Sequence, residues 1–133
     1  MAELTFVGAN IIIYASGKES PFRARALSFL ESIGRGEVEA CTDSEVFQEL
    51  LHRFRGDRPR GIKAFDWLRG LVHIVYPVTF DDMILMRELF EKYPQPSTRD
   101  LVHIAVMHHN GVKKVASYDH DYDAVPLVER FEP

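Results

Sequence analysis

The amino-acid sequence predicts an α/β protein, a three-layer α/β/α sandwich around a central, mainly parallel sheet of four or five strands. Short apolar runs rich in Val, Ile and Phe alternate along it with longer segments whose apolar residues recur at helical spacing. Strands joined by such helical crossovers run parallel and are covered on both faces. The chain has 133 residues, so we expect one domain over residues 1–133.

Strands are predicted where short apolar runs end at turn residues or at proline. They are expected over residues 3–7, 37–42, 73–79, 113–119 and 127–133, the last at an edge of the sheet. Pro77 is expected to stop the third strand, because proline donates no hydrogen bond to a neighbouring strand. Cys41 is the only cysteine, which excludes an internal disulfide, and we expect it to be a small buried strand residue.

Helices are predicted between these strands, at segments with an apolar stripe and capping residues. They are expected over residues 10–15, 20–36, 43–56, 59–70, 81–94 and 97–111. Thr42, Asp43 or Ser44 can cap the third helix, and Ser97 or Thr98 can cap the last. The first helix contains three successive isoleucines, which by themselves favour a strand.

The charge balance excludes a strongly basic protein. Sixteen basic and 20 acidic residues give a net charge of −4, so any nucleic-acid contact needs a local basic patch or a bridging metal. Candidates for such a patch are residues 55–63, Arg23 with Arg25, and Arg99, although runs like these are more often solvated surface. No apolar run approaches the roughly 18 residues of a membrane span, and no signal peptide is recognisable, so we expect a cytoplasmic location.

Four carboxylates from three separate segments are expected to meet at the carboxyl ends of the strands. Asp119 and Asp121 follow the fourth strand, Asp100 lies in the first turn of the last helix, and Glu49 lies on the helix after the second strand. Asn10 follows the first strand. Carboxylates brought together repel one another, and a divalent cation removes that cost. Oxygen ligands suit Mg²⁺ or Mn²⁺, which support phosphoryl transfer.

Each of these residues also has a structural interpretation. Asp100 can complement the helix dipole, which is worth about 0.3 to 1 kcal/mol. Glu49 can pair with Arg53 one turn later, and Glu45 lies on the same helix face. The aspartates after the fourth strand can be turn residues. His103, one turn after Asp100, is expected to form hydrogen bonds in the site or in the core. Their joint occurrence at strand ends favours the metal site.

Four segments together resemble the PIN domain, and within it the VapC-type toxins of prokaryotic toxin–antitoxin pairs. "FVGANIIIYA" is similar to the opening strand and Asp-Thr/Ala-Asn turn of that family, and "SEVFQELLHR" to its Ser-x-x-x-x-Glu helix. "STRDLVHIAVMHHNGV" is similar to its Asp-bearing helix, and "VASYDHDYDAV" to its closing Thr/Ser-x-Asp-x-Asp-Phe segment. The segments occur in the family's order and spacing, and they cover nearly the whole chain.

This resemblance implies a three-layer PIN fold and an Mg²⁺- or Mn²⁺-dependent ribonuclease that cuts single-stranded or structured RNA. In the toxin branch it also implies a homodimer restrained by a small antitoxin protein. By position it assigns the metal to Glu49, in preference to Glu45, and to Asp100 and Asp119, with Asp121 as an auxiliary catalytic residue. Asn10 and Ser117 match the supporting polar residues, and Tyr122 stands where the family usually has Phe.

Gly8 departs from the family pattern, because it occupies the position of the first metal-binding Asp. Three explanations are open: an introduced Asp-to-Gly change that disarms a toxic nuclease, a natural loss of activity with a retained binding role, or a metal held by the remaining carboxylates with extra waters. The other motif residues, Asn10, Glu49, Asp100 and Asp119, are all present. Because these residues are retained, we favour a nuclease site in which only the first Asp is replaced.

Two classes of function therefore compete. The first is an enzyme that hydrolyses RNA phosphodiesters, and the second is a non-catalytic module that binds RNA or an antitoxin-like protein through the same acidic cleft. A receiver-type domain also has an acidic pocket, but no Lys follows the late strand at the expected place. Apolar stripes over residues 62–71 and 81–90 make self-association plausible, although burial within the monomer is commoner.

Overall fold

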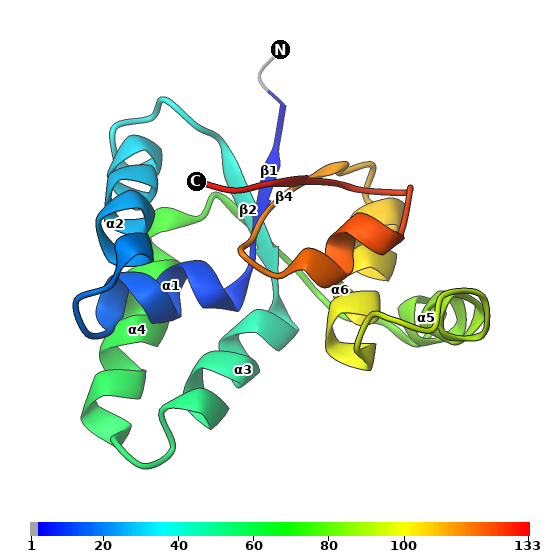
Figure 1. The fold of residues 1–133 in the computed structure, drawn as a ribbon, viewed down its shortest axis with the longest axis horizontal. Helices are drawn as coiled ribbons and strands as arrows, with labels where there is room; N and C mark the ends of the chain where they lie inside the picture. The colour runs from blue at the N-terminus through cyan, green and yellow to red at the C-terminus, as the bar shows by residue number, and fades with distance from the viewer. Residues whose placement is uncertain (1–2) are drawn as a thin grey trace.

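A five-stranded parallel sheet forms the middle of the protein in the computed structural model, which describes residues 3–133 (Figure 1). The strands, in spatial order β3-β2-β1-β4-β5, pair in parallel with every neighbour. Their bounds are β1 Thr5–Val7, β2 Ala40–Asp43, β3 Ile74–Tyr76, β4 Lys114–Ala116 and β5 Glu129–Phe131. The predicted parallel sheet, with its last strand at an edge, is confirmed.

Helices cover the sheet in two groups. Their bounds are α1 Ala9–Ser16, α2 Pro21–Gly34, α3 Ser44–Arg53, α4 Arg58–Leu71, α5 Phe80–Lys92 and α6 Thr98–His109, with a 3₁₀ helix η1 at His120–Ala124. The first four helices pack against one another, and α5 packs against α6 on the other side of the strands (Figure 1). This arrangement is the predicted α/β sandwich.

Local chemistry explains where these elements begin and end. The Ser20 hydroxyl accepts a hydrogen bond from the Arg23 amide at the start of α2, and Thr79 and Asp82 cap α5 reciprocally. β3 ends directly before Pro77, as predicted. The strands are otherwise shorter than predicted, three or four residues each. The fourth strand ends early because Ser117 and Asp119 beyond it form hydrogen bonds in the following turn and at the start of η1.

The core includes buried residues of β1, β2 and β4, of α1 to α4 on one side of the sheet, and of α6 on the other. Every residue of α6 from Asp100 to Met107 is buried, so this helix is enclosed on all sides over two turns. β1 and β2 are buried along their whole length, and Cys41 is fully buried in β2, as expected. Within residues 3–133, none of the helices combines the length and the apolar character that crossing a bilayer requires.

The order in which successive strands join the sheet reverses at β1, the central strand. β2 lies on one side of it and β4 on the other, so a crevice opens beyond the carboxyl ends of β1 and β4. Val7 pairs with Ala116 in register, and the Gly8 amide donates to the Ala116 carbonyl at 3.1 Å. The turn after β1 therefore lies directly beside the turn after β4.

Candidate functional site

A cleft of about 190 Å³ occupies this crevice. Four segments far apart in the sequence line it: the start of α1, the middle of α3, the start of α6 and the turn after β4. Among the lining residues are five of the six positions that the sequence singled out, Asn10, Glu49, Asp100, Ser117 and Asp119. The topology therefore brings the predicted polar residues to one place.

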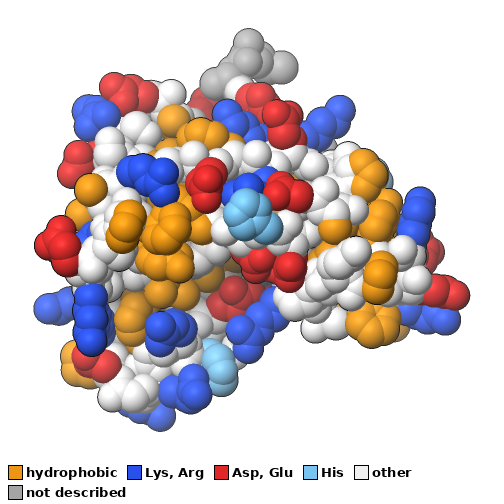
Figure 2. All heavy atoms as spheres, viewed as in Figure 1, with side chains coloured by type: hydrophobic (Ala, Val, Ile, Leu, Met, Phe, Trp, Pro, Cys, Tyr) orange, Lys and Arg blue, Asp and Glu red, His pale blue; other side chains and the backbone are white. Residues whose placement is uncertain are grey.

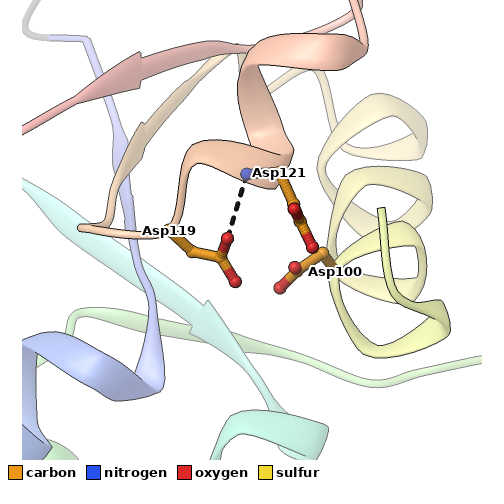
Figure 3. A group of neighbouring side chains, drawn as sticks. All are labelled: Asp100, Asp119 and Asp121. Carbon is orange, nitrogen blue, oxygen red and sulfur yellow. Dashed lines mark hydrogen bonds between the residues drawn. The ribbon is translucent and has the colours of Figure 1, made fainter. Parts of the chain in front are cut away.

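Three carboxylates converge at this cleft. Asp100, Asp119 and Asp121 each offer an oxygen, and these oxygens lie within 4.8 Å of one another. Figure 3 shows the three side chains meeting from α6, from the turn after β4 and from η1. An Asp119 oxygen accepts from the Asp121 amide at 2.9 Å, and an Asp121 oxygen accepts from the Ser97 amide at 3.3 Å. Asp121 thus belongs to the group as closely as the other two.

Asp100 is the buried member of this group, with 8% of its surface exposed. Its pKa is raised to about 7, first by burial and then by the neighbouring Asp119 carboxylate, while His103 and Ser97 act in the opposite direction. The Ser97 hydroxyl caps α6 and donates to Asp100 at 3.2 Å, which fixes the carboxylate. The raised pKa thus reflects first the burial of Asp100 and second its closeness to another carboxylate.

Asn10 and Ser117 connect the two strand ends beneath the carboxylates. The Asn10 amide donates to the Ser117 hydroxyl oxygen at 3.0 Å and accepts from the Tyr118 backbone amide at 3.3 Å. The Ser117 oxygen also accepts from the Asp119 amide at 3.0 Å. The position of Asp119 is therefore tied through these contacts to the start of α1.

Glu49 lines the same cleft, but its hydrogen-bond partner is a histidine. Its Oε1 lies 2.5 Å from Nε2 of His103, whose Nδ1 lies 2.7 Å from an oxygen of Asp43. Glu49 thus contacts His103 and not Arg53, so the interpretation of Glu49 as an exposed member of a helix ion pair is wrong. Only 15% of the Glu49 side chain is exposed.

The buried imidazole of His103 lies between two carboxylates. Burial alone would lower its pKa, but hydrogen bonds to Asp43 and Glu49 and the charges of both outweigh burial and raise the pKa to about 10. His103 is therefore an imidazolium at neutral pH. It partly neutralises the acidic end of the sheet and holds Glu49 at the cleft.

Gly8 lies at the wall of the cleft, at the N-cap of α1, where it offers no side-chain ligand. Its backbone has φ −76°, a conformation open to any residue. A Cβ atom at this position would lie 3.3 Å from the Ala116 carbonyl oxygen and 3.7 Å from the Ser117 side chain. A side chain here is therefore accommodated if the Ala116 carbonyl moves by a few tenths of an ångström.

Comparison with known proteins identifies the family. Residues 5–127 match the family model described as PIN domain. The chain belongs to the PIN domain family. It is 34% identical over 129 residues to Ribonuclease VapC13 of Mycobacterium tuberculosis, a match that covers 96% of this chain and 98% of the relative, and it falls within the VapC group.

Solved structures share the fold of this PIN domain. The VapC20 structure of M. tuberculosis, described as a Sarcin-Ricin loop cleaving toxin, superposes with a TM-score of 0.71 at 19% identity and covers 92% of this chain and 97% of its own. A chain of a toxin–antitoxin complex from Klebsiella pneumoniae gives 0.66 at 14% identity and covers 97% and 99%. These matches rule out the receiver-type alternative.

Sequence reasoning missed one residue of the PIN-domain site. The sequence indicates Asp43 only as a helix cap. Asp43 does cap α3, where it accepts from the Val46 amide at 3.0 Å, and its second oxygen also binds His103. The signal was present, because Asp43 ends β2 as Asp119 follows β4. The partner of Asp43 comes from a helix 60 positions away, which spacing along the chain does not reveal.

His103→Gln tests the imidazolium. A glutamine amide can donate to only one of the two carboxylates, so the variant should lose about 3 kcal/mol of unfolding free energy at neutral pH. Because the folded pKa of His103 is about 10 against an ordinary 6.5, its contribution is present below pH 6.5 and disappears as the pH rises to about 10. Urea unfolding across this range measures both effects. His108→Gln, an exposed position on the same helix, should change little.

Asp100→Asn tests the charge of the carboxylate group. The pKa of Asp100 is higher in the folded chain than its ordinary 3.8, so ionising Asp100 destabilises the fold as the pH rises from about 4 to about 7. Asparagine cannot ionise, and in EDTA the variant should gain about 2 kcal/mol relative to wild type over this window, then no more. Denaturant unfolding measures this gain. An equal gain in Asp66→Asn, at an exposed position on α4, would contradict the assignment.

Proposed function

We propose that this protein is a metal-dependent ribonuclease of the cytoplasm, the toxin of a toxin–antitoxin pair, and that Gly8 impairs its activity. The observation that carries the proposal is the convergence of Asp100, Asp119 and Asp121 within 4.8 Å at the switch point of the sheet. The VapC13 relative, whose name describes a ribonuclease, supports the same activity.

The residues present suit a divalent cation. All three carboxylates offer oxygen, which Mg²⁺ and Mn²⁺ prefer, and the raised pKa of Asp100 reflects a negative charge that a cation would relieve. We assign the metal to Asp100, Asp119 and Glu49, which all line the cleft, with Asp121 beside them as an auxiliary residue. The chemistry that such an ion supplies when bound is polarisation of a phosphodiester and activation of water at neutral pH.

The chain itself orients these groups before substrate arrives. Ser97 fixes Asp100, and Asn10 with Ser117 fixes Asp119, so the carboxylates need not reorganise when a phosphodiester binds. His103 binds one oxygen of Glu49, which fixes that side chain at the cleft. Glu49 is thus suited to accept a proton from an attacking water or to help hold the ion.

Gly8 favours a second candidate, a PIN module without catalytic activity that binds RNA or an antitoxin-like protein. Gly8 lines the cleft without a side-chain ligand, at the position where the resemblance implies an aspartate. The unneutralised carboxylates that remain would attract Arg and Lys side chains of a protein partner. The two candidates predict different RNA cleavage when Gly8 is replaced by aspartate.

Gly8→Asp, with Gly8→Asn as its control, separates these candidates. Both side chains have the same size and both can cap α1, but only aspartate adds a charge. We expect Gly8→Asp to bind Mn²⁺ about tenfold or more tightly than wild type and to cleave RNA faster, because ligand charge sets the affinity of such sites. Calorimetry and cleavage of a labelled RNA measure the two effects.

Gly8→Asn should resemble wild type in both assays. If Gly8→Asp folds and binds Mn²⁺ but cleaves no RNA with any divalent metal, the ribonuclease proposal fails and the binding module remains. Equal gains in Gly8→Asn would show that helix capping, and not a metal ligand, is responsible.

The partners that we propose are RNA, a small antitoxin protein and a second copy of the chain. The toxin–antitoxin complex from K. pneumoniae, whose chain has the same fold, supports the antitoxin. Large apolar side chains exposed on α5 support the homodimer: Phe80 is 77% exposed, Ile84 46% and Phe90 60%. Phe80 and Ile84 lie one turn apart on the same face, so two copies of α5 could cover each other.

Phe80→Ser combined with Ile84→Ser tests the homodimer. We expect light scattering to give twice the chain mass for wild type and the single chain mass for the double variant, because the apolar stripe is lost. Leu51→Ser, which removes an apolar side chain that is 43% exposed on α3, should stay dimeric. A wild-type protein that is monomeric at all concentrations tested would exclude the homodimer.

A further inference from the structure

A second, larger cleft of about 580 Å³ lies beside the carboxylate cleft. It is formed by the end of α1, the loop that follows it, and the connection between α3 and α4. Ile13 lines both clefts, so the two are separated by one side chain. Its volume is in the range of ligand-binding pockets, whereas the carboxylate cleft alone is smaller than these.

The charge available in this larger cleft is positive. Three cations, Lys18, Arg53 and Arg60, line it against two carboxylates, Glu19 and Asp57, and Glu19 pairs with Arg23 at 3.5 Å. Among the described residues, no carboxylate lies within 4 Å of the charged groups of Lys18 and Arg53, both of which are exposed. Because Glu49 binds His103, it does not neutralise Arg53.

The wall of the cleft also carries aromatic surface. Tyr14 and Phe54 line it, and the Arg60 guanidinium lies over the Phe54 ring, 5.5 Å from its centre, while donating to the Ser16 carbonyl. Arg60 thus holds the wall together. Tyr14 is half-buried and leaves part of its surface facing solvent. Cations combined with an aromatic side chain are the features of a groove that binds single-stranded nucleic acid.

A further cation lies at the carboxylate cleft itself. Arg99 lines that cleft, is exposed, and has no carboxylate within 4 Å in the described part of the chain. It lies in the first turn of α6, where the helix dipole disfavours a positive charge, so helix stability does not explain it. Figure 2 shows Lys and Arg side chains gathered around α3, beside acidic side chains at the centre of this face.

We propose that these cations form one binding path for single-stranded RNA, which runs from Arg99 across the carboxylates and past Ile13 into the cleft of Lys18 and Arg53. This inference rests on the proposed function, since the path would bring the RNA strand to the carboxylate cleft. Its cations lie on both sides of the carboxylates, as a phosphodiester backbone passing over an acidic centre requires. In the larger cleft, a base next to the scissile bond would stack on the exposed part of Tyr14.

Binding, measured apart from cleavage, tests the path. The probe is a fluorescein-labelled single-stranded RNA of about twelve nucleotides, titrated in EDTA with fluorescence anisotropy as the readout. We expect Lys18→Ala with Arg53→Ala, and separately Arg99→Ala, to weaken binding by on the order of tenfold. Each lost phosphate contact should reduce the slope of log affinity against log salt by about 0.7.

Matched variants separate local contacts from net charge. Arg87→Ala removes one charge from α5, where Arg87 is 77% exposed and pairs with Glu91, and should bind RNA as wild type does. Arg53→Lys should keep most of the affinity, because it keeps the charge. All these positions are exposed, and thermal unfolding checks that each variant folds.

Two results would overturn the path: RNA affinities that stay at the wild-type value in all the variants, or losses of the same size in Arg87→Ala. In the first case the larger cleft serves another ligand, such as a protein segment. A duplex RNA of the same length that binds as tightly as the single strand would also overturn it. Because binding is measured in EDTA, a failure of the cleavage proposal leaves this test unaffected.

Discussion

The contact between His103 and two carboxylates is the interaction on which the acidic end of this sheet depends. Asp43 closes β2, Glu49 projects from α3, and His103 comes from α6, so one imidazolium joins elements from the two helical layers. The group has little access to water, and each charge in it is matched only by the others. The imidazolium offsets one of the two negative charges that Asp43 and Glu49 bring to this end of the sheet.

The carboxylates at the switch point remain in excess even so. The raised pKa of Asp100 expresses that excess, since burial and Asp119 together make a second negative charge unfavourable. Rigid contacts from Ser97, Ser117 and Asn10 prevent the side chains from turning away into solvent. The chain thus maintains an arrangement that costs stability when no ligand is bound, which is typical of functional sites.

Much of the fold could be predicted from the sequence, because apolar periodicity and the chemistry of helix ends are local properties. Pro77 stops β3 and Ser97 begins α6 where the sequence indicated. The length of the fourth strand could not be predicted in this way. The sequence predicts a strand that continues through residues 117–119, but the Ser117 hydroxyl oxygen accepts from Asn10 and from the Asp119 amide, and Asp119 caps η1. The contact with Asn10 exists only once α1 lies beside β4.

The site was predictable to the extent that parallel strands place their ends together. That rule located Asp119 and Asp121 near Asp100, but it could not say that Asp121 approaches them as closely as it does. It also gave no partner for Glu49, because the neighbour one turn later on a helix and a histidine 54 positions away are equally compatible with the sequence. Long-range contacts of buried ionisable groups decide such questions, and they depend on packing.

The crossover order of the sheet also affects how the protein is made. The central strand is the first to be synthesised, whereas its neighbour β4 and the turn with Asp119 and Asp121 come near the end of the chain. For most of its translation, the nascent polypeptide therefore contains only the residues on the β1 side of the crevice. The edge of β1 that β4 later covers stays exposed during this time. The three aspartates can meet only once residue 121 has been synthesised, so the growing chain lacks the complete carboxylate group until its synthesis is almost finished.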